Sequence, residues 1–148
     1  MLIFTASILF GLYINAQEIE KYENNFFSIV TPKSWAITSL EITNGDSFDF
    51  YSGDGLILNI KYYEIDKTQS TNNIINKYIS DLKTELRTEI IRGSAIISKR
   101  NATQLTYKVK DTQTIEDVFI YKNVLYSIKY AKNAEQIMTV INSIILKK

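Results

Sequence analysis

The side chains that could perform chemistry in this chain are carboxylates, lysines and tyrosines, because the sequence contains no histidine and no cysteine. Their absence excludes Ser–His and Cys–His nucleophile pairs and most zinc, copper, haem and iron–sulfur sites. It also excludes disulfides, so the core alone must stabilise the fold. We therefore expect no enzyme, no cofactor, and no catalytic or metal-ligating residues.

Two carboxyl groups about 5–9.5 Å apart could still hydrolyse a glycosidic bond. The close pairs are Glu116 with Asp117 and Glu18 with Glu20. Neighbouring residues of a strand point to opposite faces, which separates Glu116 from Asp117. Glu18 and Glu20 are expected in a loose terminus. A carboxylate-dependent hydrolase is thus the third hypothesis for function.

Asp46, Asp49 and Asp54 lie in a glycine-containing stretch and could offer oxygen ligands to Ca²⁺. Their spacing is not that of an EF-hand loop, since no closing Glu follows. The alternative, which we favour, is that Asp46 and Asp54 serve turns while Asp49 lies on the solvent side of a strand.

Aromatic residues are frequent in the predicted strands. Exposed together they could stack on a sugar or contact a protein, whereas at strand period they more often cover a core. Tyr62 and Tyr63 are adjacent and must point to opposite faces, so one of them could be exposed. The set comprises Trp35, Tyr51, Tyr62, Tyr63, Tyr121, Tyr126 and Tyr130.

Two smaller motifs receive ordinary structural interpretations. Asn101-Ala102-Thr103 has the form of a glycosylation sequon, and we interpret it as a polar turn. Lys147 and Lys148 are expected at the end of the last helix, where they would favour its dipole.

Residues 1–16 predict where the protein works. They carry no charge and are almost wholly apolar from Leu2 to Ile14, too short a run for the roughly 20 residues that span a bilayer. This pattern predicts a signal peptide cut between Ala16 and Gln17, although no basic residue precedes Lys21. The alternatives are an uncleaved amphipathic anchor and a buried N-terminal helix. We expect an exported bacterial protein, periplasmic or secreted, without a stable membrane anchor after signal removal.

Residues 17–148 are expected to form a single domain, because no linker or repeat interrupts them. A hydrophobic content of 45% and a charged content of 22% are ordinary for a globular protein. The net charge of +1 gives no electrostatic reason to expect nucleic acid as a partner.

Hydrophobic periodicity predicts the elements that must position these side chains. Strands are expected at residues 25–31, 35–42, 48–50, 56–65, 94–98, 104–110, 116–121 and 124–130, with Lys122-Asn123 as a two-residue hairpin. Phe48 and Phe50 alternate with Asp49, and Val124, Tyr126, Ile128 and Tyr130 share one face of their strand. A helix over 72–86 should be capped by Thr71 or Asn72 and end before Gly93. Its apolar stripe, which should face the core, comprises Ile74, Ile75, Tyr78, Ile79, Leu82 and Leu86. A second helix should begin at Asn133 and bury Ile137, Val140, Ile141 and Ile144. The fold class expected is α+β, a central antiparallel sheet with two main helices packed on it.

The two ends of this layout resemble the PsbP-like family, which includes a photosystem II extrinsic subunit and many exported bacterial proteins. Residues 22–35 (YENNFFSIVTPKSW) are similar to the family's opening strand, proline and tryptophan. The hairpin over 118–130 and the helix ending Ile141-Asn142-Ser143-Ile144 are similar to its closing segment. The resemblance implies a PsbP-like sandwich and a protein that binds or assembles other proteins. The manganese–calcium surroundings of the photosynthetic members have no motif here, so no site residue is transferred.

Together these observations give three hypotheses. The first is an exported, non-catalytic binding or assembly-accessory domain that acts on a cell-envelope protein. The second is a periplasmic carrier of a small ligand (a lipid, sugar or metal), using a pocket between the sheet and the helix over 72–86. The hydrolase is the third.

Overall fold

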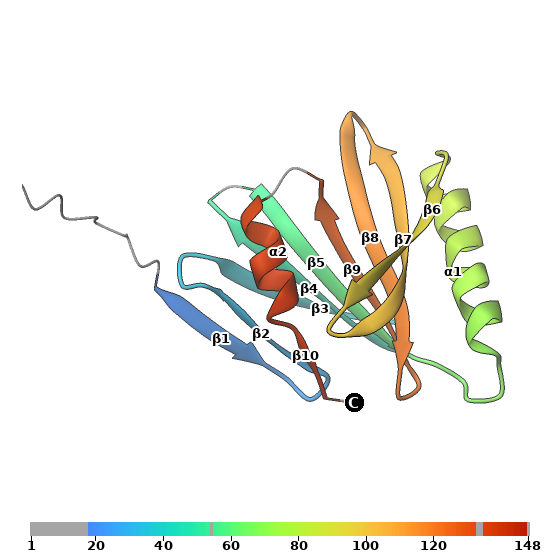
Figure 1. Cartoon of the computed structure of the whole chain (residues 1–148), viewed down its shortest axis with the longest axis horizontal. Helices are drawn as coiled ribbons and strands as arrows, with labels where there is room; N and C mark the ends of the chain where they lie inside the picture. The colour runs from blue at the N-terminus through green and yellow to red at the C-terminus, as the bar shows by residue number, and fades with distance from the viewer. Residues whose placement is uncertain (1–17, 54, 133–134, 148) are drawn as a thin grey trace, which may run out of the picture.

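The computed structural model describes residues 18–53, 55–132 and 135–147. The predicted signal peptide with its cleavage site at Ala16 and Gln17, as well as Asp54 and Asn133, lies outside the described residues. Within the described ranges the chain forms ten strands and two helices (Figure 1). In chain order these are β1 (Ile19–Glu23), β2 (Phe27–Pro32), β3 (Ala36–Ile42), β4 (Gly45–Ser52), β5 (Gly55–Glu64), α1 (Thr71–Leu86), β6 (Ile91–Ile97), β7 (Arg100–Val109), β8 (Thr112–Tyr121), β9 (Val124–Ala131), α2 (Glu135–Asn142) and β10 (Ile145–Leu146).

Seven strands form one antiparallel sheet in the order β3-β4-β5-β9-β8-β7-β6. The predicted alternation of Phe48 and Phe50 is confirmed, since both are buried on one face. The hairpin between β8 and β9 is also confirmed. Its two residues, Lys122 and Asn123, have φ angles of 48° and 64°, as a tight mirror-image turn requires.

A second, three-stranded sheet has the order β1-β2-β10. β2 carries the fully buried Phe27 and Ile29 and ends at Pro32, close to the predicted boundary. β1 and β10 were not predicted. β10 is only two residues long and pairs Ile145 with Ser28 and Leu146 with Phe27.

This small sheet and α2 cover one face of the large sheet. α2 lies beside β2 and β10 (Figure 1). Its predicted stripe is confirmed, because Ile137, Val140, Ile141 and Ile144 are all buried. The stripe belongs to one core with the shared face of β9, which is made of Val124, Tyr126, Ile128 and Tyr130.

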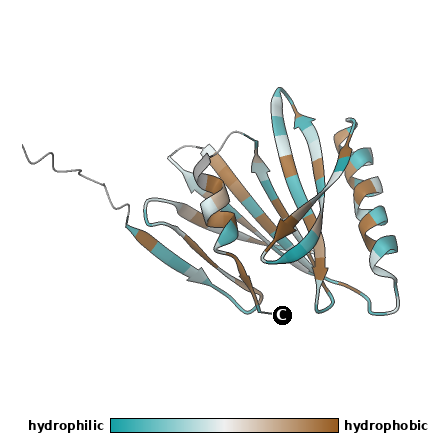
Figure 2. Cartoon of the chain, in the orientation of Figure 1, coloured by the Kyte–Doolittle hydropathy of each residue, from teal (hydrophilic) through white to brown (hydrophobic). Residues whose placement is uncertain are grey.

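α1 covers the other face of the large sheet. Its stripe alternates with hydrophilic residues along the helix (Figure 2) and packs on Leu105, Val118 and Leu125. The helix is capped by Ser70, whose Oγ accepts the N–H of Asn73 at 3.3 Å, and not by Thr71 or Asn72. It ends at Arg87 in the left-handed region with φ 51°, whereas Gly93 lies within β6.

The predicted fold class was wrong. The described residues are mostly β, arranged in two sheets of seven and three strands with two short helices, and not as a single central sheet carrying two main helices. The physical reason lies in β1 and β10. β1 is a charged segment, IEKYE, and β10 is two residues long, so neither shows the hydrophobic alternation that predicts a strand. Both nevertheless pair with β2, and the three strands form a sheet separate from the large one.

No helix in the described part of the chain is both long and apolar enough to pass through a membrane.

Candidate binding site

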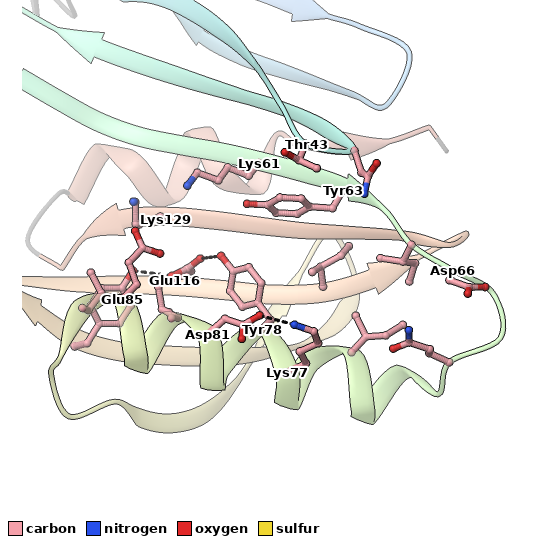
Figure 3. A pocket seen from close by; sticks show the side chains of 18 of the residues that line it. Thr43, Lys61, Tyr63, Asp66, Lys77, Tyr78, Asp81, Glu85, Glu116 and Lys129 are labelled. Carbon is pink, nitrogen blue, oxygen red and sulfur yellow. Dashed lines mark hydrogen bonds and ion pairs between the residues drawn. The ribbon is translucent and has the colours of Figure 1, made fainter.

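A cavity of about 720 Å³ opens between α1 and the face of the seven-stranded sheet (Figure 3). It lies where the second hypothesis expects a pocket. Its wall comes from β5, β7, β8 and β9, from α1, from the turn between β3 and β4, and from the connection between β5 and α1. The lining residues are Thr43, Asn44, Lys61, Tyr63, Ile65, Asp66, Gln69, Ile74, Lys77, Tyr78, Asp81, Leu82, Glu85, Leu86, Tyr107, Val109, Glu116, Leu125 and Lys129.

The strand register explains which side chains face the cavity. β5 and β9 are neighbours, and Tyr63 lies opposite Leu125 while Lys61 lies opposite Ser127. One step further along the same face, Asn59 lies opposite Lys129. Because side chains alternate, Lys61, Tyr63, Leu125 and Lys129 share the face that α1 covers.

Glu116 is the buried polar centre of this site, with only 2% of its surface exposed. Its Oε1 accepts hydrogen bonds from the Tyr78 hydroxyl (2.5 Å) and from Ser127 Oγ. Its Oε2 accepts a hydrogen bond from the Tyr107 hydroxyl at 2.6 Å. The buried carboxylate thus accepts hydrogen bonds from three hydroxyl groups, and buried polar groups are ordinarily hydrogen-bonded in this way.

The tyrosines of this cluster are held protonated. Burial, and then the charge of Glu116, raise the pKa of Tyr78 and of Tyr107 above the ordinary value of 10.0. Burial likewise raises the pKa of Tyr63. The hydroxyls of Tyr78 and Tyr107 therefore remain donors, and their hydrogen bonds to Glu116 fix this wall of the cavity.

Lys61 and Lys129 lie together at one end of the cavity, with Asp66 at the other end (Figure 3). Both are half-buried. Among the described residues neither lysine has a carboxylate oxygen within the 4.0 Å that defines an ion pair. In contrast, Lys77 pairs with Asp81 at 2.9 Å on α1.

The structure separates the predicted carboxylate pairs. Glu116 faces α1, whereas Asp117 faces the other side of β8, where its oxygens accept from Gln104 (3.0 Å) and Tyr130 (2.9 Å). The predicted separation of Glu116 and Asp117 is therefore confirmed. Glu18 and Glu20 are exposed, and Glu20 belongs to strand β1, so the expected loose terminus was wrong.

The two described aspartates of the calcium alternative also lie on opposite faces of β4. Asp46 accepts the Tyr62 hydroxyl on the core side, and Asp49 accepts the Asn59 amide at 2.6 Å on the other side. Across the described residues there is no group of three or more carboxylate, His or Cys side chains placed to hold a metal ion.

The favoured interpretation, that the aromatic residues of the strands cover a core, is confirmed for four of the set. Trp35, Tyr62, Tyr126 and Tyr130 are buried in the core. Tyr63 is half-buried and points to the face opposite Tyr62, as predicted, and it alone of the set lines the cavity. Half-buried Tyr121 lies under the guanidinium of Arg100, 3.7 Å from the ring centroid.

Two smaller predictions also differ from the structure. Asn101 lies within strand β7, not in a turn. Lys147 follows β10 rather than a helix, and it binds Glu23 and the carbonyl of Asn24 (2.7 Å). The hydrogen bonds and charges of Lys147 and Lys21 lower the pKa of Glu23 to about 2.

Sequence reasoning missed Lys61, Tyr107 and Lys129, which line the cavity, and Ser127, which donates to Glu116. It placed Tyr78 only in an apolar stripe. One signal was present. Glu116 shares its strand face with Val118 and Ile120, and a carboxylate on an apolar face indicates a buried polar network.

Neither a family model nor a curated protein matches this sequence. A search of solved structures finds cyanobacterial PsbP from Synechocystis sp. PCC 6803, in solution, with 13% sequence identity and a TM-score of 0.59. The match covers 90% of this chain and 95% of that one. The chain therefore has a PsbP-like fold.

Proposed function

We propose, starting from the PsbP-like fold, that this chain is an exported, non-catalytic binding domain, and that the cavity between α1 and the sheet is its ligand site. The observation that carries the proposal is the cavity itself. Its volume of about 720 Å³ falls in the range of roughly 300–1,000 Å³ typical of small-molecule sites. Its lining combines six aliphatic side chains and three tyrosines with ten polar or charged residues, so a ligand could be held through both apolar and polar contacts.

Two observations favour binding over catalysis. The sequence offers no histidine or cysteine as base or nucleophile. The one buried carboxylate of the cavity, Glu116, accepts hydrogen bonds from three hydroxyls, while Asp117 faces the opposite side of β8. The predicted pair of Glu116 and Asp117 therefore does not face one substrate, as a carboxylate-pair hydrolase would need.

The proposal is tested by a thermal-shift screen of lipids, sugars and metal ions on the chain from Gln17. A ligand at 100 times its dissociation constant adds about 2.7 kcal/mol to the free energy of unfolding. Leu82→Trp fills the cavity from α1, and Lys83→Trp puts the same side chain on the exposed neighbouring position. The shift should persist in Lys83→Trp and disappear in Leu82→Trp.

A second readout does not depend on a variant. Bound ligand should change the amide NMR shifts of β5 and β9 and leave those of β1 and β2 in place. A screen without any shift, or shifts confined to β1 and β2, would contradict the proposal.

A second candidate function, the assembly accessory of a cell-envelope protein, is favoured by the resemblance and by a specific surface. A groove of about 450 Å³ lies between the free edges of β6 and β10. Ile96 (71% exposed) and Ile145 (62% exposed) flank it, together with Lys99 and Arg100. Free strand edges and exposed apolar side chains are typical of protein contacts.

Crosslinking in the envelope fraction tests this candidate. We expect one stoichiometric protein that is lost when Ile96 and Ile145 are both changed to Lys. Leu40→Lys, on the edge strand β3 at the other end of the sheet, is the matched control because Leu40 is 67% exposed. A partner retained by the double variant, or no partner, would remove this candidate.

Export itself remains a proposal, supported by the apolar segment of residues 1–16. Mass spectrometry of the protein from its native envelope should give a chain that begins at Gln17. An intact N-terminus would favour the uncleaved anchor or the buried helix.

A further inference from the structure

Most carboxylates that line the cavity have a hydrogen-bond or ion-pair partner, whereas two of its lysines have no ion-pair partner among the described residues. This difference indicates the chemistry of the ligand. Three of the lining carboxylates already have partners. Asp81 pairs with Lys77 (2.9 Å), Asp66 accepts the backbone N–H of Thr68 (2.9 Å), and Glu116 accepts three hydroxyls. Glu85, the remaining one, is exposed at the C-terminal end of α1.

Lys61 and Lys129 are the lining cations without such a partner within the described part of the chain. They are diagonal neighbours on β5 and β9, a relation that places such side chains about 7–8 Å apart at their bases. Two half-buried ammonium groups repel each other there. An anion between them would offset that repulsion and accept charge-assisted hydrogen bonds from both.

Glu116 does not form an ion pair with either lysine and so does not neutralise their charge. It lies opposite Lys129 in the register of β8 and β9. Its two oxygens, however, receive Tyr78, Tyr107 and Ser127, and they form no ion pair with the lysine. The carboxylate thus faces its hydroxyls, and the lysine ammonium groups remain available at the cavity end.

The apolar part of the cavity continues from the lysines in one direction. Along β5 the order on this face is Lys61, then Tyr63, then Ile65 at the far end, and Leu125 lies opposite Tyr63 on β9. Ile74, in the first turns of α1, lines the same far end. A ligand that spans the cavity therefore meets two cations first and then Tyr63, Leu125 and Ile74, while Asp66 lies at the far end (Figure 3).

We propose that the cavity takes a long-chain carboxylate, with its head between Lys61 and Lys129 and its hydrocarbon chain along Tyr63, Leu125 and Ile74. This inference rests on the proposed function of the same cavity. Burial of each methylene of the chain contributes about 0.8 kcal/mol, and the two lysines select the charge of the head.

Titration calorimetry on the chain from Gln17 tests the inference with dodecanoate, dodecanol and dodecyltrimethylammonium, each below its micelle concentration. The three probes share one hydrocarbon chain and differ in the charge of the head. Dodecanoate should bind most tightly. Lys61→Gln and Lys129→Gln should each weaken dodecanoate about tenfold or more, as expected for a lost charge-assisted hydrogen bond, and leave dodecanol unchanged.

Two control variants sharpen the test. Lys83→Gln removes an exposed α1 lysine outside the cavity lining and should change nothing. Glu85→Gln removes the exposed carboxylate of the cavity lining and should leave dodecanoate binding unchanged or tighter.

The outcomes separate the two proposals. Dodecanol or dodecyltrimethylammonium binding as tightly as dodecanoate, or dodecanoate binding unaffected by both lysine variants, would overturn the inference and leave a ligand-binding cavity. A second outcome is that none of the three probes binds, while another compound raises the melting temperature of the native chain but not of Leu82→Trp. The cavity then binds a ligand, and the proposed ligand class is wrong. If no compound binds at all, the proposed function fails with it.

Discussion

The hydroxyl of Tyr107 donates a hydrogen bond to Oε2 of Glu116 at 2.6 Å, from the neighbouring strand and beneath α1. Tyr107 lies opposite Thr114, one step along the face from Glu116, so the phenol reaches the carboxylate diagonally. With Tyr78 from α1 it joins the helix to the sheet through one buried acid. This network adds polar contacts between α1 and the sheet to the apolar packing around them.

Tyr107→Phe should therefore destabilise the protein. The change leaves Oε2 of a buried carboxylate without its donor, and hydrogen bonds to charged groups contribute about 1.5–3 kcal/mol. Tyr63→Phe is the control, because the described residues offer its hydroxyl no hydrogen bond while its ring lies in the same cluster. Urea denaturation should give a loss in that range for Tyr107→Phe and almost none for Tyr63→Phe. Equal losses would mean that Glu116 does not depend on this donor.

Asp117→Asn should change the pH dependence of stability. Burial, the largest cause, raises the pKa of Asp117 above its ordinary value of 3.8. A raised pKa in the folded state means that the contribution of this group is fully present below 3.8 and is lost as pH rises through the folded value. Asparagine does not ionise, so the variant avoids that loss.

The free energy of unfolding of Asp117→Asn, minus that of the native chain, should therefore increase as pH rises from below 3.8 to neutral. Urea titrations at a series of pH values measure this difference. A difference that stays constant or falls with pH would show that Asp117 is not destabilised by burial.

Gly45→Ala should severely destabilise the pairing of β4 with β5 in the large sheet. A Cβ on Gly45 would overlap the backbone carbonyl oxygen of Tyr62 and lie 3.1 Å from the Cα of Tyr63. Backbone atoms of a paired strand cannot give way without breaking the register. Gly93→Ala in β6 is the matched control, since its Cβ would meet nothing nearer than 3.9 Å. Thermal denaturation should separate the two variants clearly, and a native melting temperature for Gly45→Ala would contradict the pairing.

Ile141→Ala and Met138→Ala compare the two sides of α2. Ile141 is 0% exposed and Met138 is 43% exposed, on the same eight-residue helix. Truncation of a buried isoleucine costs about 2–5 kcal/mol, whereas surface changes stay within about 0.5 kcal/mol. Chemical denaturation measures both. Similar small losses would mean that α2 does not close the core between the two sheets.

The sequence predicted a helix or strand correctly where the hydrophobic residues of that segment repeat with the period of the element. The stripe from Ile74 to Leu86 predicted α1 to within a residue, and the alternation over 124–130 predicted β9 and its buried face. The same reasoning failed at β1 and β10. Residues 19–23 are mostly charged, and the partner of Ile145 is Ser28, far away in the sequence. Nothing local in either segment encodes that pairing.

The candidate site shows the same division. The sequence suggested a pocket between the sheet and the helix over 72–86, and a cavity lies there. It did not suggest Lys61 with Lys129, or Tyr107 with Glu116, because each pair joins strands whose register is a property of the assembled sheet. A lysine in a strand is ordinarily a solvated residue, and only a partner strand and a covering helix make it half-buried.

By itself the sequence determined what the chain has to work with: no histidine or cysteine, a helix with one apolar face, alternating strands, and the opening segment that resembles PsbP-like proteins. Those properties depend on residue type and on short-range spacing, which sterics and the hydrophobic effect translate into local structure. The tertiary structure decided the division into two sheets and the meeting of lysines, tyrosines and Glu116 around one cavity. Both depend on contacts between residues distant in the chain, which form only when the whole core closes.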